Sequence, residues 1–162
     1  MEKKNTIEEK AKVAKVDKIF RLRTGIVIDH IPAFKSFEVV ELLGLDHPGE
    51  GNAVMAIGVN LKSKKHTAKD VIKVENMRIC KEEINKISMI APRATVSMIR
   101  DHKIKDKIRV KIPDVVEGLL KCPNHNCVTN FEPVKTKFHH NSGQMKCHFC
   151  EKSFNLTEMK LL

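Results

Sequence analysis

Apolar and polar residues alternate in short blocks along the first two thirds of the chain, and most blocks predict one element each. Segment 24–31 is apolar and β-branched, which predicts a strand. Segments 53–61 and 71–76 predict two more strands, the second with one face buried. The polar stretch 62–70 between them is expected to be a connection, so the two strands are expected to pair as antiparallel neighbours.

Two helices are predicted between these strands. Segment 36–45 fits a short amphipathic helix that Ser36 can cap and that ends at Gly44. Segment 81–91 has isoleucines at helical spacing, and Pro92 stops that helix.

The order of elements predicts the fold class. Segment 94–112 returns to alternation and is expected to form two more strands, which gives the split βαβ order of a ferredoxin-like α+β fold with two helices. Pro113 and Gly118 break regular structure, so we place a boundary between a sheet domain, 16–112, and a small β-rich domain, 113–162.

Composition and charge narrow the class of protein. The 162 residues carry a net charge of +10, which attracts phosphate groups or is simply a soluble surface. Trp and Tyr are absent, so a stacking platform for single-stranded nucleic acid is disfavoured. Residues 1–15 are expected to be a charged arm, with no apolar core typical of a secretory signal, and no segment is long and apolar enough to cross a membrane. We therefore expect a cytoplasmic protein.

Four of the five cysteines form two close pairs, separated by nineteen residues. They are Cys122, Cys127, Cys147 and Cys150. Two tight turns that each present two sulfurs suit one tetrahedral Zn²⁺, and four protein ligands leave no open position, so the metal is structural. Free cysteines or disulfides are the alternatives, and His125 or His148 could replace a sulfur. Cys80 is interpreted as a small buried apolar residue.

The remaining polar residues allow both a functional and a structural interpretation. Asp29 and His30 could anchor a polar ligand or satisfy each other at a turn, and as neighbours on a strand they should face opposite sides of the sheet. Lys73 and Lys107 could flank one anion if their strands adjoin, or could be solvated lysines at strand edges. No phosphate-binding glycine loop or nucleophile elbow is present, so an enzyme that uses Asp29 and His30 has little support.

Several segments together resemble the regulatory chain of aspartate carbamoyltransferase. They follow in the order of that family and span most of 16–155: "GIVIDHIPA" (25–33), "AIGVNLKS" (56–63), "KDVIKVEN" (69–76), "APRATVSMI" (91–99), "CPNHNC" (122–127) and "CHFCEKSF" (147–154). The resemblance implies a subunit without catalytic activity that acts in pyrimidine biosynthesis. It implies a ferredoxin-like domain that binds ATP or CTP, a zinc domain that docks on the catalytic chain, and pairing of two regulatory chains.

The resemblance also implies roles for individual residues. The four paired cysteines match the zinc ligands. The positions that match the nucleotide site are Lys18, Ile19, Asp29, His30, Val71, Lys73, Ser97, Ile99, Ile104 and Lys107. Ser97 stands where members have asparagine, and His102 where some have tyrosine. The alternative from a different class is a zinc-ribbon module that binds nucleic acid, for which affinity would fall with salt.

Overall fold

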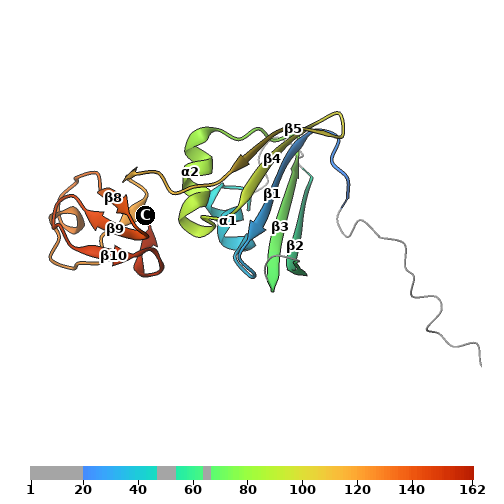
Figure 1. Cartoon of the computed structure of the whole chain (residues 1–162). Helices are drawn as coiled ribbons and strands as arrows, with labels where there is room; N and C mark the ends of the chain where they lie inside the picture. The colour runs from blue at the N-terminus through green and yellow to red at the C-terminus, as the bar shows by residue number, and fades with distance from the viewer. Residues whose placement is uncertain (1–19, 47–53, 64–66) are drawn as a thin grey trace, which may run out of the picture.

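The first part of the chain folds into a five-stranded antiparallel sheet with two helices. The computed structural model describes residues 20–46, 54–63 and 67–162. In chain order the elements are β1 (Gly25–Ile31), α1 (Ser36–Leu42), β2 (Met55–Lys62), β3 (Ala68–Glu75), α2 (Lys81–Ile90), β4 (Thr95–Arg100) and β5 (Lys103–Arg109). The strand order is β2-β3-β1-β4-β5, and all neighbours are antiparallel (Figure 1). The first four strands have the ferredoxin-like order, which confirms the predicted fold class, and β5 adds one edge.

The core of this domain lies between the sheet and the helices. Alternate residues of the central strands point toward α1 and α2 and are almost fully buried, among them Ile26, Ile28, Ile72, Val74 and Val96. The intervening residues therefore point to the opposite face, which we call the open face. Neither described helix covers it, because both lie on the other side of the sheet (Figure 1).

Two local expectations are corrected, one at β3 and one at the start of α1. The strand β3 begins at Ala68, so 62–70 is not entirely a connection. Lys35 is at the N-cap position and Ser36 is already helical. The buried carboxylate of Asp70 on β3 accepts a hydrogen bond from the backbone N–H of Ser36 at 3.0 Å. Asp70 therefore caps the helix, where the Ser36 hydroxyl was expected to do so.

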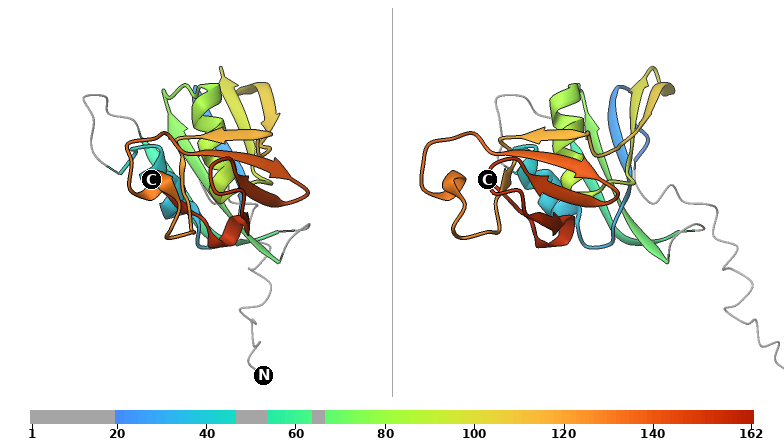
Figure 2. Two further views of the ribbon diagram at one scale, coloured as in Figure 1. Left: turned by 90° about the vertical axis from the view of Figure 1, so that its left-hand side faces the viewer. Right: turned by 60° about the vertical axis from the view of Figure 1, so that its left-hand side comes forward.

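The second part of the chain is a small set of short strands. They are β6 (Val115–Glu117), β7 (Leu120–Lys121), β8 (Lys137–Asn141), β9 (Gln144–Cys147), β10 (Ser153–Asn155) and β11 (Lys160–Leu161), with two 3-10 helices, η2 (Val128–Asn130) and η3 (Leu156–Glu158). Phe138 and Met145 are fully buried at the centre, beside three of the cysteines. Met89, at the end of α2, belongs to the same core, so α2 contacts the second domain as well as the sheet (Figure 2).

The two α-helices of the described residues are short. Neither is long and apolar enough to cross a membrane.

Cys80 lies on the surface, which corrects its interpretation as a buried apolar residue. It is the N-cap of α2, and its backbone N–H donates to the Glu83 carboxylate at 2.7 Å. The polar cap explains its exposure, because the first turn of a helix needs partners for its free N–H groups. The backbone N–H of Glu83 favours the thiolate, but the carboxylates of Glu82 and Glu83 outweigh it and raise the pKa of Cys80.

We expect one of the five thiols to react with a thiol reagent in the folded, zinc-loaded protein. Cys80 is exposed, whereas three of the other four thiols are buried and all four lie close enough together to hold one metal ion, which would protect them. Counting reacted thiols with Ellman's reagent at pH 8, before and after denaturation with a chelator, should give one and then five. A Cys80→Ser variant should give none in the folded state, and any fast-reacting thiol left in that variant would contradict the closed metal site.

Candidate functional site

The two cysteine pairs come together into one cluster. The sulfur atoms of Cys122, Cys127, Cys147 and Cys150 all lie within 4.8 Å of one another. Sγ of Cys122 is 3.7 Å from Sγ of Cys150, and Sγ of Cys127 is 3.8 Å from Sγ of Cys147. A tetrahedral ion with Zn–S bonds of about 2.3 Å separates its sulfurs by about 3.8 Å. The cluster therefore fits one four-sulfur structural zinc, and no histidine is needed.

Local hydrogen bonds shape the first metal-binding turn. The backbone N–H of Cys127 donates to the Asn124 carbonyl at 2.9 Å and closes the turn. The side chain of Asn130 donates to the carbonyls of Cys122 and Asn124, at 3.1 and 2.9 Å. Asn130 thus holds the turn from η2, a role that nothing in its local sequence indicated.

The surroundings of the sulfurs shift the pKa values of three of the four thiols, and not all in the same direction. Burial raises the pKa of Cys122 and of Cys147. Burial acts in the same direction on Cys150, but hydrogen bonds from the Lys152 backbone and the Asn124 side chain lower its pKa to about 7. Burial thus disfavours the thiolate forms of Cys122 and Cys147, and a bound dication would supply the charge that makes these thiolates stable.

The residues expected to bind a nucleotide lie largely on the open face of the sheet. Strand pairing places Lys73, Val27, Ser97 and Lys107 in one row across β3, β1, β4 and β5. An adjacent row brings Ile99 opposite Ile104, and strand alternation places Val71 and Asp29 on the same face. Lys18 and Ile19 lie outside the described residues.

Lys73 and Lys107 do not lie on adjoining strands, as their joint binding of one anion required. β1 and β4 separate β3 from β5, which puts the two backbones about 14 Å apart across the sheet. The Lys73 ammonium donates to the Phe20 carbonyl at 2.8 Å. The two lysines can therefore contact different parts of one elongated ligand rather than one phosphate.

Asp29 and His30 do not face opposite sides of the sheet, which corrects the expectation from strand alternation. The pairing of β1 with β3 shifts between Ile28 and Ile31, and His30 has a φ of 63°. This bulge brings His30 Nδ1 within 3.4 Å of an Asp29 carboxylate oxygen. Lys69, which the resemblance had not singled out, forms an ion pair with Asp29 at 2.6 Å.

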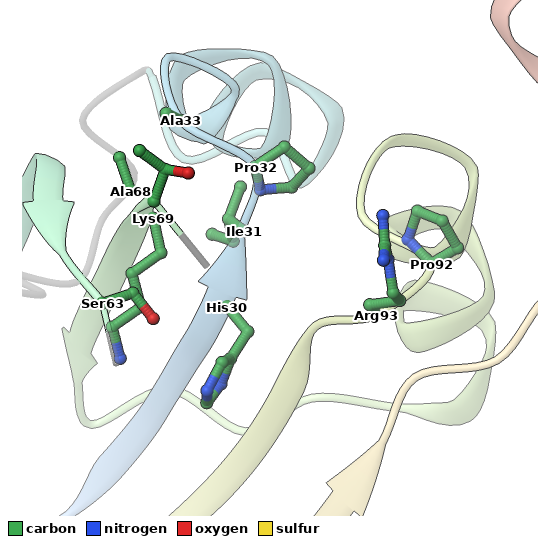
Figure 3. A pocket seen from close by; sticks show the side chains of 10 residues that line it. His30, Ile31, Pro32, Ala33, Ser63, Ala68, Lys69, Pro92 and Arg93 are labelled. Carbon is green, nitrogen blue, oxygen red and sulfur yellow. The ribbon is translucent and has the colours of Figure 1, made fainter. Parts of the chain in front are cut away.

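Two adjoining cavities lie at the end of the sheet next to His30. The first, of about 830 Å³, has Lys69 on one side of His30 and Arg93 on the other (Figure 3). The second, of about 610 Å³, is lined by four cationic side chains together with His30, Thr95 and two apolar residues. The cations are Arg93, Lys107, Arg109 and Lys111. Among the described residues no carboxylate lines either cavity, so this end of the sheet suits a polyanion.

Comparison with known proteins gives matches over both halves of the chain. Residues 15–111 match the allosteric domain of the aspartate carbamoyltransferase regulatory chain, and residues 114–160 match its metal binding domain. The chain is 44% identical over 145 residues to the aspartate carbamoyltransferase regulatory chain of Pyrococcus horikoshii, which covers 88% of this chain and 95% of that one. It is 47% identical over 145 residues to that of Thermococcus kodakarensis, covering 88% and 94%, and 45% identical over 134 residues to that of Bacteroides fragilis, covering 81% and 86%.

Proposed function

The chain belongs to the family of aspartate carbamoyltransferase regulatory chains, and we propose that it binds ATP and CTP as allosteric effectors of that enzyme in the cytoplasm. It is a regulatory and not a catalytic chain. Residues 16–112 form the effector domain in this proposal, residues 113–162 the zinc domain, and residues 1–15 a charged arm. Two regulatory chains pair with each other, and each docks on a catalytic chain.

The observation that carries the effector proposal is the unbalanced charge at one end of the sheet. Arg93, Lys107, Arg109 and Lys111 line one cavity without an acidic neighbour among its lining residues. Alternation along β5 sends Lys107 and Arg109 to the open face, while Ile108 between them packs on the core. Cations gathered at one end repel one another, and a triphosphate would relieve that repulsion.

The rest of the open face suits the nucleoside part of the ligand. Away from the cationic end, the apolar side chains of Ile99 and Ile104 offer surface for a base and ribose, and Ile104 is 60% exposed. Val71 is only 8% exposed and lies nearer the cationic end. Lys73 lies about 14 Å from Lys107 across the sheet, a separation that suits the two ends of an extended nucleotide. Ser97 lies in the row between them, and Asp29 and His30 follow on β1 toward the cationic end. ATP or CTP would therefore extend across β3, β1, β4 and β5.

Docking on the catalytic chain is assigned to the metal-binding turns. Asn124 and Asn126 flank the first turn and Glu151 follows the second, and all three reach the surface. Phe131 is 73% exposed beside the first turn. A rigid metal site that presents polar groups around an exposed aromatic ring has the composition of an interface anchor.

The contact between the domains gives the effector a path to the partner. Met89 on α2 is buried in the core of the zinc domain, whereas Ile84 and Ile87 of the same helix pack on the sheet. A ligand that favours one position of the sheet relative to α2 therefore also favours one position of the zinc domain. The resulting free energy is shared between the effector and the catalytic chain, so each changes the affinity of the other.

We expect Lys107→Ala to weaken ATP and CTP binding at least tenfold, because a charge-assisted hydrogen bond contributes about 1.5–3 kcal/mol. Isothermal titration of each nucleotide into the full chain measures this. The matched control is Lys105→Ala, which removes the same charge from β5 at a position that lines neither cavity. Equal affinities of the two variants would reduce the proposal to general electrostatics, and no binding by the unaltered chain would refute it.

A further inference from the structure

Residues 20–23, which we call the strap, cross the open face just before β1. Leu22 is only 3% exposed, yet it belongs to neither apolar core. Lys73 points to the open face, and its ammonium donates to the Phe20 carbonyl. The strap therefore covers part of the same face on which Lys73, Ile99 and Ile104 lie.

His102 fastens the strap from the opposite side. It is the second residue of the two-residue turn between β4 and β5, in which Asp101 and His102 have φ values of 51° and 59°. The backbone N–H of His102 donates to the Arg23 carbonyl at 3.0 Å, and the ring Nδ1 lies 3.0 Å from the Leu22 carbonyl. A carbonyl only accepts, so the ring carries its proton on Nδ1 and donates it.

We infer that His102 is a positioning residue of the effector site, which holds the strap over the nucleoside end of the bound nucleotide. The inference rests on the proposed function. The turn follows Arg100 directly, so His102 stands next to the Ile99 and Ile104 wall, at the opposite end of β5 from Lys107 and Arg109. The imidazole sets how closely the strap approaches that wall and leaves the phosphate end untouched.

Two substitutions separate positioning from stability. His102→Asn keeps a side-chain N–H at nearly the place of Nδ1, and Asn tolerates a positive φ. His102→Gly removes the donor, and Asp-Gly is a favoured pair for this turn, so the hairpin itself is not weakened. If His102 served only the structure of the turn, the glycine variant would be at least as stable as the unaltered chain and would bind the nucleotides equally well.

The test measures three ligands and one cleavage reaction on the full chain. We expect His102→Gly to bind ATP and CTP about tenfold more weakly, as loss of one hydrogen bond and of strap order implies, and His102→Asn to stay within about threefold. Tripolyphosphate should bind all three proteins equally. Trypsin should cut after Arg21 and Arg23 in the strap faster in the glycine variant alone, as judged by mass spectrometry.

The outcomes distinguish the positioning role of His102 from the effector proposal. Unchanged nucleotide affinity in His102→Gly, or equal losses in both variants, would overturn the positioning role. A matching loss of tripolyphosphate affinity would also overturn it, because the effect would then reach the phosphate end. If the unaltered chain binds neither ATP nor CTP, the proposed function fails. Equal tryptic cleavage of all three proteins would independently refute the positioning of the strap by His102.

Discussion

Loss of the metal is expected to unfold residues 113–162 and to release the catalytic chain, while the sheet domain stays folded. Three of the four sulfurs are buried within the same small core as Phe138 and Met145, so the metal and the core stabilise one another. Zinc binding contributes about 10–16 kcal/mol in small zinc domains. A whole domain is stable by only about 5–15 kcal/mol, so this segment cannot keep its fold without the ion.

Cys147→Ser tests this with Cys80→Ser as the matched control. Both replace a thiol by a hydroxyl, but Cys147 is a fully buried metal ligand and Cys80 is an exposed helix cap. Hydrogen exchange should show lost protection in β8 and β9 of Cys147→Ser, with protection retained in β1 and β3. Gel filtration with a catalytic chain should give a complex for the unaltered chain and for Cys80→Ser only.

The same experiment with a chelator or a mercurial removes the ion without a substitution. Metal analysis must accompany the gel filtration, because a closed four-sulfur site releases its ion slowly. A complex that persists after verified loss of zinc would contradict docking through this domain. It would move the interface to the sheet domain, where Phe34 and Phe37 are exposed aromatic residues as well.

Repeating local patterns made most of the fold predictable. Alternation marked the strands because one face of each is buried, and the isoleucines of α2 marked its helical face in the same way. The cysteine spacing identified the metal site because a tight turn presents two sulfurs from its own few residues. Such features depend on neighbours in the chain, which is what a single sequence displays.

The errors arose where a distant residue supplied a partner. Ser36 has the right chemistry for a cap, but the first N–H of the helix donates instead to Asp70, thirty-four residues further along the chain. The bulge at His30 depends on the register between β1 and β3, which no local pattern encodes. It brings the side chains of Asp29 and His30 within 3.4 Å of each other, whereas alternation would separate them, and Lys69 lies beside Asp29.

The cationic end of the effector site was only partly predictable. Lys107, Arg109 and Lys111 alternate along one segment, and that signal alone could have placed three cations on one face. Arg93 joins them from the turn after α2 and could not have been found, because its position depends on how that turn meets β1. The site thus combines one local row with residues that only the folded sheet brings near.

Asp70→Ala is expected to destabilise the sheet domain by about 2–6 kcal/mol, since each of the two N–H donors left without a partner costs about 1–3 kcal/mol. Its carboxylate is fully buried and accepts two backbone N–H groups, from Ser36 at 3.0 Å and from Asn60 at 2.8 Å. It thereby joins the start of α1 to β2 through β3. Asp70→Asn keeps one acceptor and should fall between Asp70→Ala and the unaltered chain.

The effect of Asp70 should disappear in acid. Burial acts to raise the pKa of Asp70, but the hydrogen bonds from Asn60 and Ser36 outweigh it, and the pKa lies below its ordinary value. The unfolded chain therefore takes up the proton first as the pH falls. The stability that the carboxylate contributes is complete above about pH 5 and is lost progressively below about pH 4.

Urea unfolding at pH 7 and pH 3 measures both effects, with Asp114→Asn, at an exposed carboxylate, as the control. The stability difference between the unaltered chain and Asp70→Ala should be large at pH 7 and shrink at pH 3, while the control differs little at either. A difference that is the same at both values would mean that Asp70 acts through its shape rather than its charge. The stability of the start of α1 would then come from packing of the Asp70 side chain, and the protonation state of its carboxylate would not affect it.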